Sequence, residues 1–248
     1  MEAVNFFTIQ RTITDTDVDF ARRQKLSSMF GCFQDIAAFH AANLGGSVTR
    51  LHDELNVAWI LVRVRVEVDR YPMYADEVTV ETWPQKPRGL YERDYRIRRA
   101  SDGEVLVRAG SVWAIMNLAT REVKRDQFLD YAGVEIKKDR ALGKSFGRMK
   151  PQPDGGLAYE KIIRYSDLDY NSHVNNSKYV DIAMDAVPFT EHRGRAVRAF
   201  EIHYSNEAGP DSVLEIRKKT LDDGRLYVDG VRQGDGLDVF NAVIEFDG

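Results

Sequence analysis

The chain carries the same order of elements twice, and this duplication limits the possible folds more than any other feature. Each half has a short acidic segment, one amphipathic helix and a run of strands with period-2 patterning. The acidic segments are 15–19 and 167–171, and later 74–78 parallels 209–213 just before a strand. The alternative is chance similarity between acidic turns. The shared order of helix and strands favours two diverged copies of one unit.

Two segments have apolar residues at helical spacing. The first helix is expected from Leu26 to Leu44, where Gly45-Gly46 ends it, and the second from about Val174 to Val187, before Pro188. Residues 62–69 instead alternate valine with charged residues, which is typical of a strand with one wet face. Further strands are expected at Glu77–Trp83, Leu90–Ala100, Glu104–Asn117, Val197–Ser205, Val213–Leu221, Leu226–Gln233 and Leu237–Phe246. One helix with an antiparallel sheet in each half predicts an α+β fold.

The expected organisation has three parts. Residues 1–123 form an N-terminal repeat, 124–156 form a linker rich in Lys, Arg, Gly and Pro, and 157–248 form a C-terminal repeat. Sliding the halves by 152 residues places Asp17 on Asp169, Asp19 on Asn171 and Ala21 on His173. The first half then lacks the amide and the imidazole of the second. We therefore expect one active site per chain, in the second half.

Charge and cysteine content exclude several classes of protein. The net charge of −4 does not fit a nucleic-acid binder, whose surface would be strongly basic. The single cysteine, Cys32, permits no internal disulfide, no CxxC pair and no all-thiolate zinc site, and it favours a reducing, cytoplasmic setting. The longest uncharged apolar run, Val57–Val62, is too short to span a bilayer. The first seven residues show no basic leader, so we expect no export signal.

The densest polar cluster lies before the second helix, at Ser166–Asn176. Asp169, Asn171 and His173 alternate, and in an extended approach to the helix they would face one spot. The start of the helix adds backbone N–H groups and a positive dipole end, and such donors stabilise an oxyanion. The alternative is that Asp and Asn here are ordinary caps and turn residues, which is the interpretation we prefer for Asp167. His173 has no HxH or HExxH companion, so a zinc site is not expected.

The string Asp167–Asn176, followed by Tyr179, resembles the acyl-ACP thioesterase family, which includes plant chloroplast enzymes and bacterial relatives. The pattern D-L-D-x-N-x-H-V-N-N-x-x-Y is long, and the likeness extends over nearly the whole chain. The resemblance implies a double hotdog fold, in which each of two tandem repeats wraps a curled antiparallel sheet around a long helix. It also implies hydrolysis of the thioester between a fatty acyl group and acyl carrier protein (ACP), without a cofactor or a metal.

The resemblance assigns roles residue by residue. Asn171 and His173 match the catalytic Asn and His of the family, and Asp169 matches an acidic residue that also has a catalytic role. Residues 204–208 stand where the family has Tyr-x-x-Glu-Cys, so Glu207 matches the catalytic glutamate. Ala208 replaces the cysteine of the plant members, and a thiol nucleophile therefore does not carry over to this chain.

A water-attack mechanism follows as a hypothesis. Glu207, together with His173, would orient and deprotonate a water that attacks the thioester carbonyl. Asn171 and backbone N–H groups near Val174 would stabilise the oxyanion. Asp169 would hold Asn171 and His173 in place or tune the imidazole. A covalent acyl-enzyme on Glu207 stays open as an alternative.

The family pattern also implies that the first half supplies much of the acyl pocket. The expected lining residues are Met29, Phe33, Ile36, Trp59 and Leu61, and the alternative for each is plain hydrophobic core. ACP is acidic, so its docking surface should be basic. Three basic runs are available: Arg93, Arg96, Arg98 and Arg99; then Lys137, Lys138, Arg140, Lys144, Arg148 and Lys150; then Arg217, Lys218 and Lys219.

Other functions remain open from the sequence. An acyl-CoA thioesterase would use the same site with a different carrier. A non-catalytic acyl-ACP-binding module would use the same pocket, and a hydratase is a weaker possibility because fold alone does not fix function. Exposed sheet edges make a homodimer possible.

Overall fold

Two units make up the computed structural model, which describes residues 2–124, 129, 131–143, 147–152 and 154–247. The first unit contains the described residues up to Val64 together with 69–143. The second unit contains Arg65–Val68 and the described residues from 147 onward. Each unit has one main helix and its own antiparallel strands, which confirms the predicted α+β class.

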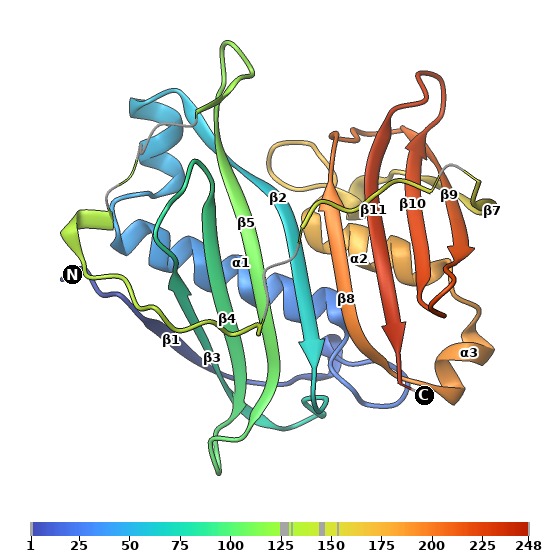
Figure 1. The fold of residues 1–248 in the computed structure, drawn as a ribbon, viewed down its shortest axis with the longest axis horizontal. Helices are drawn as coiled ribbons and strands as arrows, with labels where there is room; N and C mark the ends of the chain where they lie inside the picture. The colour runs from blue at the N-terminus through green and yellow to red at the C-terminus, as the bar shows by residue number, and fades with distance from the viewer. Residues whose placement is uncertain (1, 125–128, 130, 144–146, 153, 248) are drawn as a thin grey trace. The chain divides into compact units, whose positions relative to one another are not determined.

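The first unit places one long helix, α1 (Leu26–Asn43), against a sheet (Figure 1). The strands follow the order β1-β3-β4-β5-β2, with β6 paired to β5. Their bounds are β1 Phe7–Thr12, β2 Val57–Val68, β3 Glu77–Pro84, β4 Tyr91–Arg99, β5 Val105–Asn117 and β6 Val123–Lys124. Short helical turns lie at η1 Asp15–Asp17, η2 Arg50–Glu54 and η3 Tyr131–Gly133.

The helix α1 forms where the sequence predicts it because its apolar residues lie on one face. Phe33 on that face stacks on Tyr95 of β4, with ring centroids 4.8 Å apart. The helix ends at a glycine, as expected. Gly45 has φ +81°, a left-handed conformation that an L-residue rarely adopts, and the Gly46 amide donates back to the Ala41 carbonyl at 2.7 Å.

The second unit repeats the plan with a shorter helix, α2 (Asn176–Asp185). Its strand order is β8-β11-β10-β9-β7. The bounds are β7 Gly156–Ile162, β8 Val197–Tyr204, β9 Val213–Thr220, β10 Leu226–Arg232 and β11 Asp238–Phe246, with η4 at Tyr165–Asp167 and α3 at Phe189–Gly194. Tyr179 of α2 packs on Phe240 of β11, with ring centroids 5.4 Å apart. Pro188 separates α2 from α3.

The loops at residues 19–23 and 169–173, here called the entry loops, precede α1 and α2 and have matching hydrogen bonds. These bonds correct the predicted alignment of the two halves. The Asp19 carboxylate accepts from the amides of residues 21 and 23, and the Asp169 carboxylate accepts from those of residues 171 and 173. The helices that follow begin at Leu26 and Asn176. The offset at this loop is therefore 150 residues, and the predicted offset of 152 is wrong. Ala21 and Arg23 occupy the places of Asn171 and His173.

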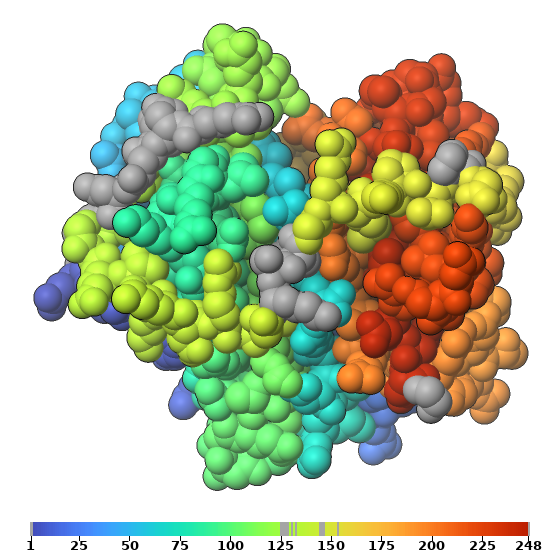
Figure 2. Space-filling view, viewed as in Figure 1, coloured from blue at the N-terminus to red at the C-terminus, as the bar shows by residue number. Residues whose placement is uncertain are grey.

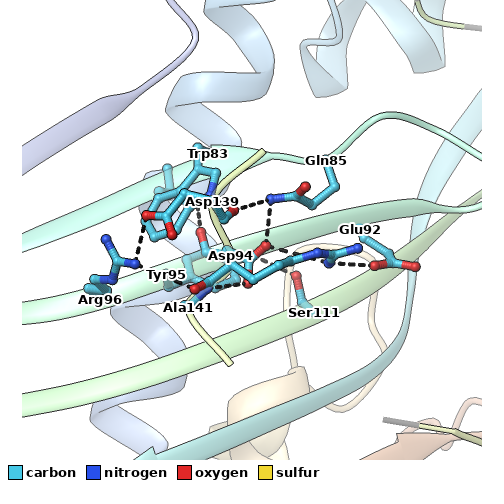
Figure 3. A network of polar contacts seen from close by, with 11 residues as sticks. Trp83, Gln85, Glu92, Asp94, Tyr95, Arg96, Ser111, Asp139 and Ala141 are labelled. Atoms are coloured by element: carbon cyan, nitrogen blue, oxygen red, sulfur yellow. Dashed lines mark hydrogen bonds and ion pairs between the residues drawn. The ribbon is translucent and has the colours of Figure 1, made fainter. Parts of the chain in front are cut away.

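Part of the predicted linker is fixed to the first unit. Its residues 133–143 lie on the outside of that unit (Figure 2). The Asp139 carbonyl accepts from the Trp83 indole and from the Gln85 amide, each at 2.8 Å, and the Ala141 amide donates to the buried Asp94 carboxylate at 3.0 Å (Figure 3). The domain boundaries at 123/124 and 156/157 stay a prediction, and residues 125–128, 130, 144–146 and 153 of the linker lie outside the described residues.

Across the described residues, we find no helix whose length and apolar character would let it cross a membrane.

Candidate active site

The residues Asp169, Asn171 and His173 lie on a tight turn between η4 and α2. The Asp169 Oδ1 atom accepts from the Asn171 amide at 2.8 Å and the His173 amide at 3.2 Å, and the Asp169 amide donates to the His173 carbonyl at 2.8 Å. Ser172 has φ +62° and its amide donates to the Asp169 carbonyl at 3.1 Å. The expected extended approach is therefore wrong, because the segment turns back on itself. The Asp169 carboxylate holds the backbone on both sides of this turn.

His173 faces Glu207, which comes from the connection between β8 and β9. The His173 Nε2 atom lies 3.6 Å from a Glu207 carboxylate oxygen, and both side chains are 41% exposed. One residue further along each segment, the Val174 amide donates to the Ala208 carbonyl at 3.0 Å. This main-chain bond joins the segment that carries the imidazole to the segment that carries the carboxylate. The pair therefore brings together an imidazole and a carboxylate, the two kinds of side chain that most often act as general bases.

Two further groups of the second unit, Arg232 and Tyr179, lie near the Glu207 segment. Arg232, at the end of β10, donates from Nη1 to the Glu207 carbonyl at 2.7 Å and forms an ion pair with Asp235. Burial raises the pKa of the Tyr179 hydroxyl, and the carboxylates of Glu207 and Asp169 raise it further. The buried tyrosine is therefore within electrostatic range of both acids. The motif includes Tyr179, but nothing in the spacing pointed to Arg232.

The backbone donors expected near Val174 are mostly occupied. The Val174 amide bonds Ala208, the Asn175 amide donates to the Asp167 carbonyl at 2.9 Å, and the Ser177 amide donates to the Asn175 side chain, which caps α2. The Val174 amide itself is therefore not free to bind an oxyanion, and the role of the other backbone donors near it stays a prediction. Within the part of the chain that the structure describes, the Asn176 amide is the donor of the first turn of α2 for which no acceptor is found.

Asp167 has the structural role that the sequence favoured. Its carboxylate accepts from the Arg164 amide at 2.8 Å and from the Lys161 ammonium, and its side chain is 9% exposed. Asp17 accepts in the same way from the Thr14 amide and the Arg11 guanidinium in the first unit. Both carboxylates close a short helical turn that precedes the main helix of their unit.

The predicted acyl-pocket residues all lie in the first unit. Phe33 and Leu61 line a small cavity whose other walls are Phe30, Gln34, Val64, Tyr95, Ser111 and Trp113. Met29 and Ile36 are fully buried in the core, and the Trp59 indole donates to the Gly46 carbonyl at 3.0 Å. Two of the five predicted residues thus line this cavity, and the role of all five in binding an acyl chain stays a prediction.

The first basic run does not form a free positive surface. Arg93 is buried and donates to the His40 Nδ1 atom at 2.9 Å. The other members form ion pairs: Arg96 with Asp139, Arg98 with Glu81, and Arg99 with Asp102 and Glu104. Arg217 and Lys219 of the third run are also paired, with Glu215 and Asp154. In the second run, Lys138, Arg148 and Lys150 are exposed, and Lys144 lies outside the described residues.

Among the residues described, no group of His, Cys, Asp and Glu side chains is arranged to hold a metal ion.

Two sequence profiles match the chain along most of its length. The profile described as the acyl-ACP thioesterase N-terminal domain matches residues 5–127, and that of the acyl-ACP thioesterase C-terminal domain matches residues 156–246. The palmitoyl-acyl carrier protein thioesterase of Arabidopsis thaliana chloroplasts is 29% identical over 217 residues, which are 82% of this chain and 52% of that protein. The chain therefore spans about half the length of this curated relative.

Solved structures share the fold. An acyl-ACP thioesterase from Bacteroides thetaiotaomicron superposes with a TM-score of 0.89 at 24% identity, and the 12:0-ACP thioesterase of Umbellularia californica with 0.86 at 24% identity; each match covers 98% of both chains. The fold is thus the double hotdog that the resemblance implied. The class that the fold defines is that of double-hotdog proteins. Within that class, the chain belongs to the acyl-ACP thioesterase family.

Proposed function

We propose that the protein hydrolyses the thioester of fatty acyl-ACP to a free fatty acid and ACP. The observation that carries the proposal is the pairing of His173 with Glu207 at 3.6 Å, on segments joined by the Val174–Ala208 hydrogen bond. Membership of the family and the match to a palmitoyl-ACP thioesterase support the substrate class. The partner is acyl carrier protein with its acyl chain on phosphopantetheine, and we propose a cytoplasmic location.

The proposed reaction uses a water molecule as the nucleophile. Glu207 and His173 together take a proton from the water as its oxygen attacks the thioester carbonyl carbon. The C–S bond then breaks, and the pantetheine thiolate leaves with that proton. The Asn171 side-chain amide and the Asn176 N–H are the donors available for the oxyanion, and one oxyanion-hole donor typically contributes about 3 kcal/mol. Asp169 acts through the backbone by holding Asn171 and His173.

Three variants test these assignments. Asn171→Ala, His173→Ala and Glu207→Ala should each lower kcat at least ~100-fold in steady-state assays with acyl-ACP. Glu207→Gln keeps the size of the side chain and should be as inactive as Glu207→Ala, because it removes only the base. A near-normal kcat in any of these variants removes that residue from the scheme. Accumulation of a covalent acyl-protein in rapid-quench experiments would replace water attack by an acyl-enzyme.

The carrier is tested by direct comparison. Purified protein should release fatty acid from acyl-ACP with a higher kcat/KM than from the same acyl group on CoA. Mass spectrometry of free fatty acids from a bacterial host that overproduces the protein gives the acyl preference. Equal or faster turnover of acyl-CoA would instead make the protein an acyl-CoA thioesterase. Tight binding of acyl-ACP with no acid released would make it an acyl-binding module.

A further inference from the structure

Both units contain the same arginine-aspartate pair at a β-hairpin. In the first unit, Arg99 ends β4 and donates to Asp102 at 2.7 Å; in the second, Arg232 ends β10 and donates to Asp235 at 2.6 Å. The glycine after each aspartate has a positive φ, +75° at Gly103 and +69° at position 236. Each glycine amide also donates to the arginine carbonyl, at 2.9 and 3.0 Å. The two hairpins therefore share one backbone arrangement, although Arg99 contacts its aspartate through Nη1 and Arg232 contacts Asp235 through Nε and Nη2.

The copies differ at the position two residues after the aspartate. In the first unit this position is Glu104, whose carboxylate accepts a second bond from Arg99 Nη1 at 2.7 Å. In the second unit it is Leu237, which has no acceptor in its side chain and is 44% exposed. The backbone is the same at both places, because the amides of Glu104 and Leu237 each donate to the preceding aspartate, at 3.0 and 3.2 Å.

Glu104 accepts from Arg99 Nη1 in the first unit, but the Nη1 atom of Arg232 in the second unit has a different partner. Arg232 Nη1 donates to the Glu207 carbonyl at 2.7 Å. The next carbonyl along the chain, that of Ala208, accepts from the Val174 amide at 3.0 Å. Two successive carbonyls are thus fixed, that of Glu207 itself and that of the residue after it. The Glu207 side chain is 41% exposed, so the fixed backbone beside it contributes to its position.

We infer that Arg232 is a positioning residue for Glu207, and that Leu237 makes this possible by leaving the Nη1 atom of Arg232 free. The inference rests on the proposed function, in which Glu207 activates water. Arg232 contacts a main-chain carbonyl and Asp235, so it acts through Glu207 and does not take part in proton transfer. Its loss should therefore lower kcat and leave KM unchanged, because the acyl-binding surface is not altered.

The sharpest test rebuilds the first-unit arrangement in the second unit. Leu237→Glu places a carboxylate where Glu104 stands, and it should draw Arg232 Nη1 away from the Glu207 carbonyl. We expect kcat to fall roughly 10- to 100-fold, since misplacement of a catalytic group by about 1 Å has effects of this size. Leu237→Met has a similar size without an oxygen atom that could accept from Arg232, and it should stay within about twofold of the wild type. Glu104→Leu in the first unit should leave kcat unchanged.

A double-mutant cycle shows whether the effect passes through Arg232. Arg232→Gln alone should lower kcat as Leu237→Glu does, and adding Leu237→Glu to it should cause no further loss. A normal kcat in Arg232→Gln overturns the inference, and so does a fully additive double variant. The proposed function is judged separately, by turnover of the wild-type protein. If the wild type is inactive on every thioester, crystal structures decide: an unchanged distance from Glu207 to His173 in Leu237→Glu overturns the positioning role.

Discussion

Asparagine in place of Asp229 is expected to stabilise the second unit, and the gain should grow with pH. Asp229 lies on β10 and is 4% exposed, and its Oδ1 atom has no hydrogen-bond partner among the described residues. Burial raises the pKa of this carboxyl from 3.8 to about 6, and the charge of Asp238 adds to the effect while Arg217 opposes it. The folded protein therefore carries an ionised, poorly solvated carboxylate at neutral pH.

The magnitude follows from the two pKa values. Because the pKa is higher in the folded than in the unfolded protein, the folded protein binds the proton more tightly. The stability that protonation contributes is complete below pH 3.8 and is lost as the pH rises through 6. At pH 8 the ionised carboxyl lowers the free energy of unfolding by about 3 kcal/mol relative to the protonated form, and at pH 5 about 1.4 kcal/mol of this loss is recovered. Asp229→Asn has no charge to bury. Its advantage over the wild type should therefore rise by about 1.4 kcal/mol between pH 5 and pH 8.

Urea unfolding at pH 5, 6, 7 and 8 measures this difference directly. Asp222→Asn is the matched control, because Asp222 is exposed in the turn before β10 and its replacement should give no pH-dependent gain. If Asp229→Asn is more stable than the wild type by the same amount at every pH, Asp229 does not titrate as described. If it is less stable at pH 8, the carboxylate makes a favourable contact that outweighs its burial.

The remaining predictions concern stability elsewhere in the fold. Burial raises the pKa of Asp17, but hydrogen bonds from Thr14 and Ser28 and the charge of Arg11 outweigh it and lower the pKa to about 2. Asp17→Asn should therefore lower the free energy of unfolding by about 2 kcal/mol at pH 7 in urea unfolding, and by progressively less as the pH falls from 3.8 towards 2. Asp15 is exposed, and Asp15→Asn should cause no comparable loss. Gly230→Ala would place its Cβ 2.3 Å from a ring carbon of Phe240 and should cost roughly 1–3 kcal/mol in the same assay. Gly31→Ala in α1 would meet no atom within 4 Å and should gain about 0.5–1 kcal/mol. Equal effects of the two substitutions would contradict the packing.

Hydrophobic periodicity predicted both main helices and most of the strands, but it missed β1 and β7. The α1 helix begins at Leu26 as expected, and β3, β9 and β10 agree with the predicted strands to within a residue or two. Burial on one face leaves a repeating signal along the chain, and a single sequence contains that signal in full. The second helix is shorter than predicted, because the Asn175 side chain caps it after Val174 and it ends at Asp185, before Pro188.

The local geometry of the site was harder to predict. Aligning identical residue types in the two halves placed Asp17 on Asp169, but the hydrogen bonds of the folded loops match Asp19 to Asp169. The carboxylate of Asp169 bonds its own neighbouring amides, and this local competition turns a segment that the alternating pattern suggested was extended. The Val174 amide and the Arg232 guanidinium find partners 34 and 25 residues away along the chain, respectively. Such contacts exist only after folding, so no spacing rule could indicate them.

The matching entry loops also bear on how the two units diverged. The turn is built from main-chain bonds to one aspartate, so its outward side chains can change without altering the path of the chain. In the first unit the place of His173 is taken by Arg23, which lies over the rings of Phe20 and Tyr71 at 5.8 and 5.2 Å. One ancestral framework could therefore lose or acquire hydrolytic chemistry through a few point substitutions, while the inherited backbone remained intact in both descendants.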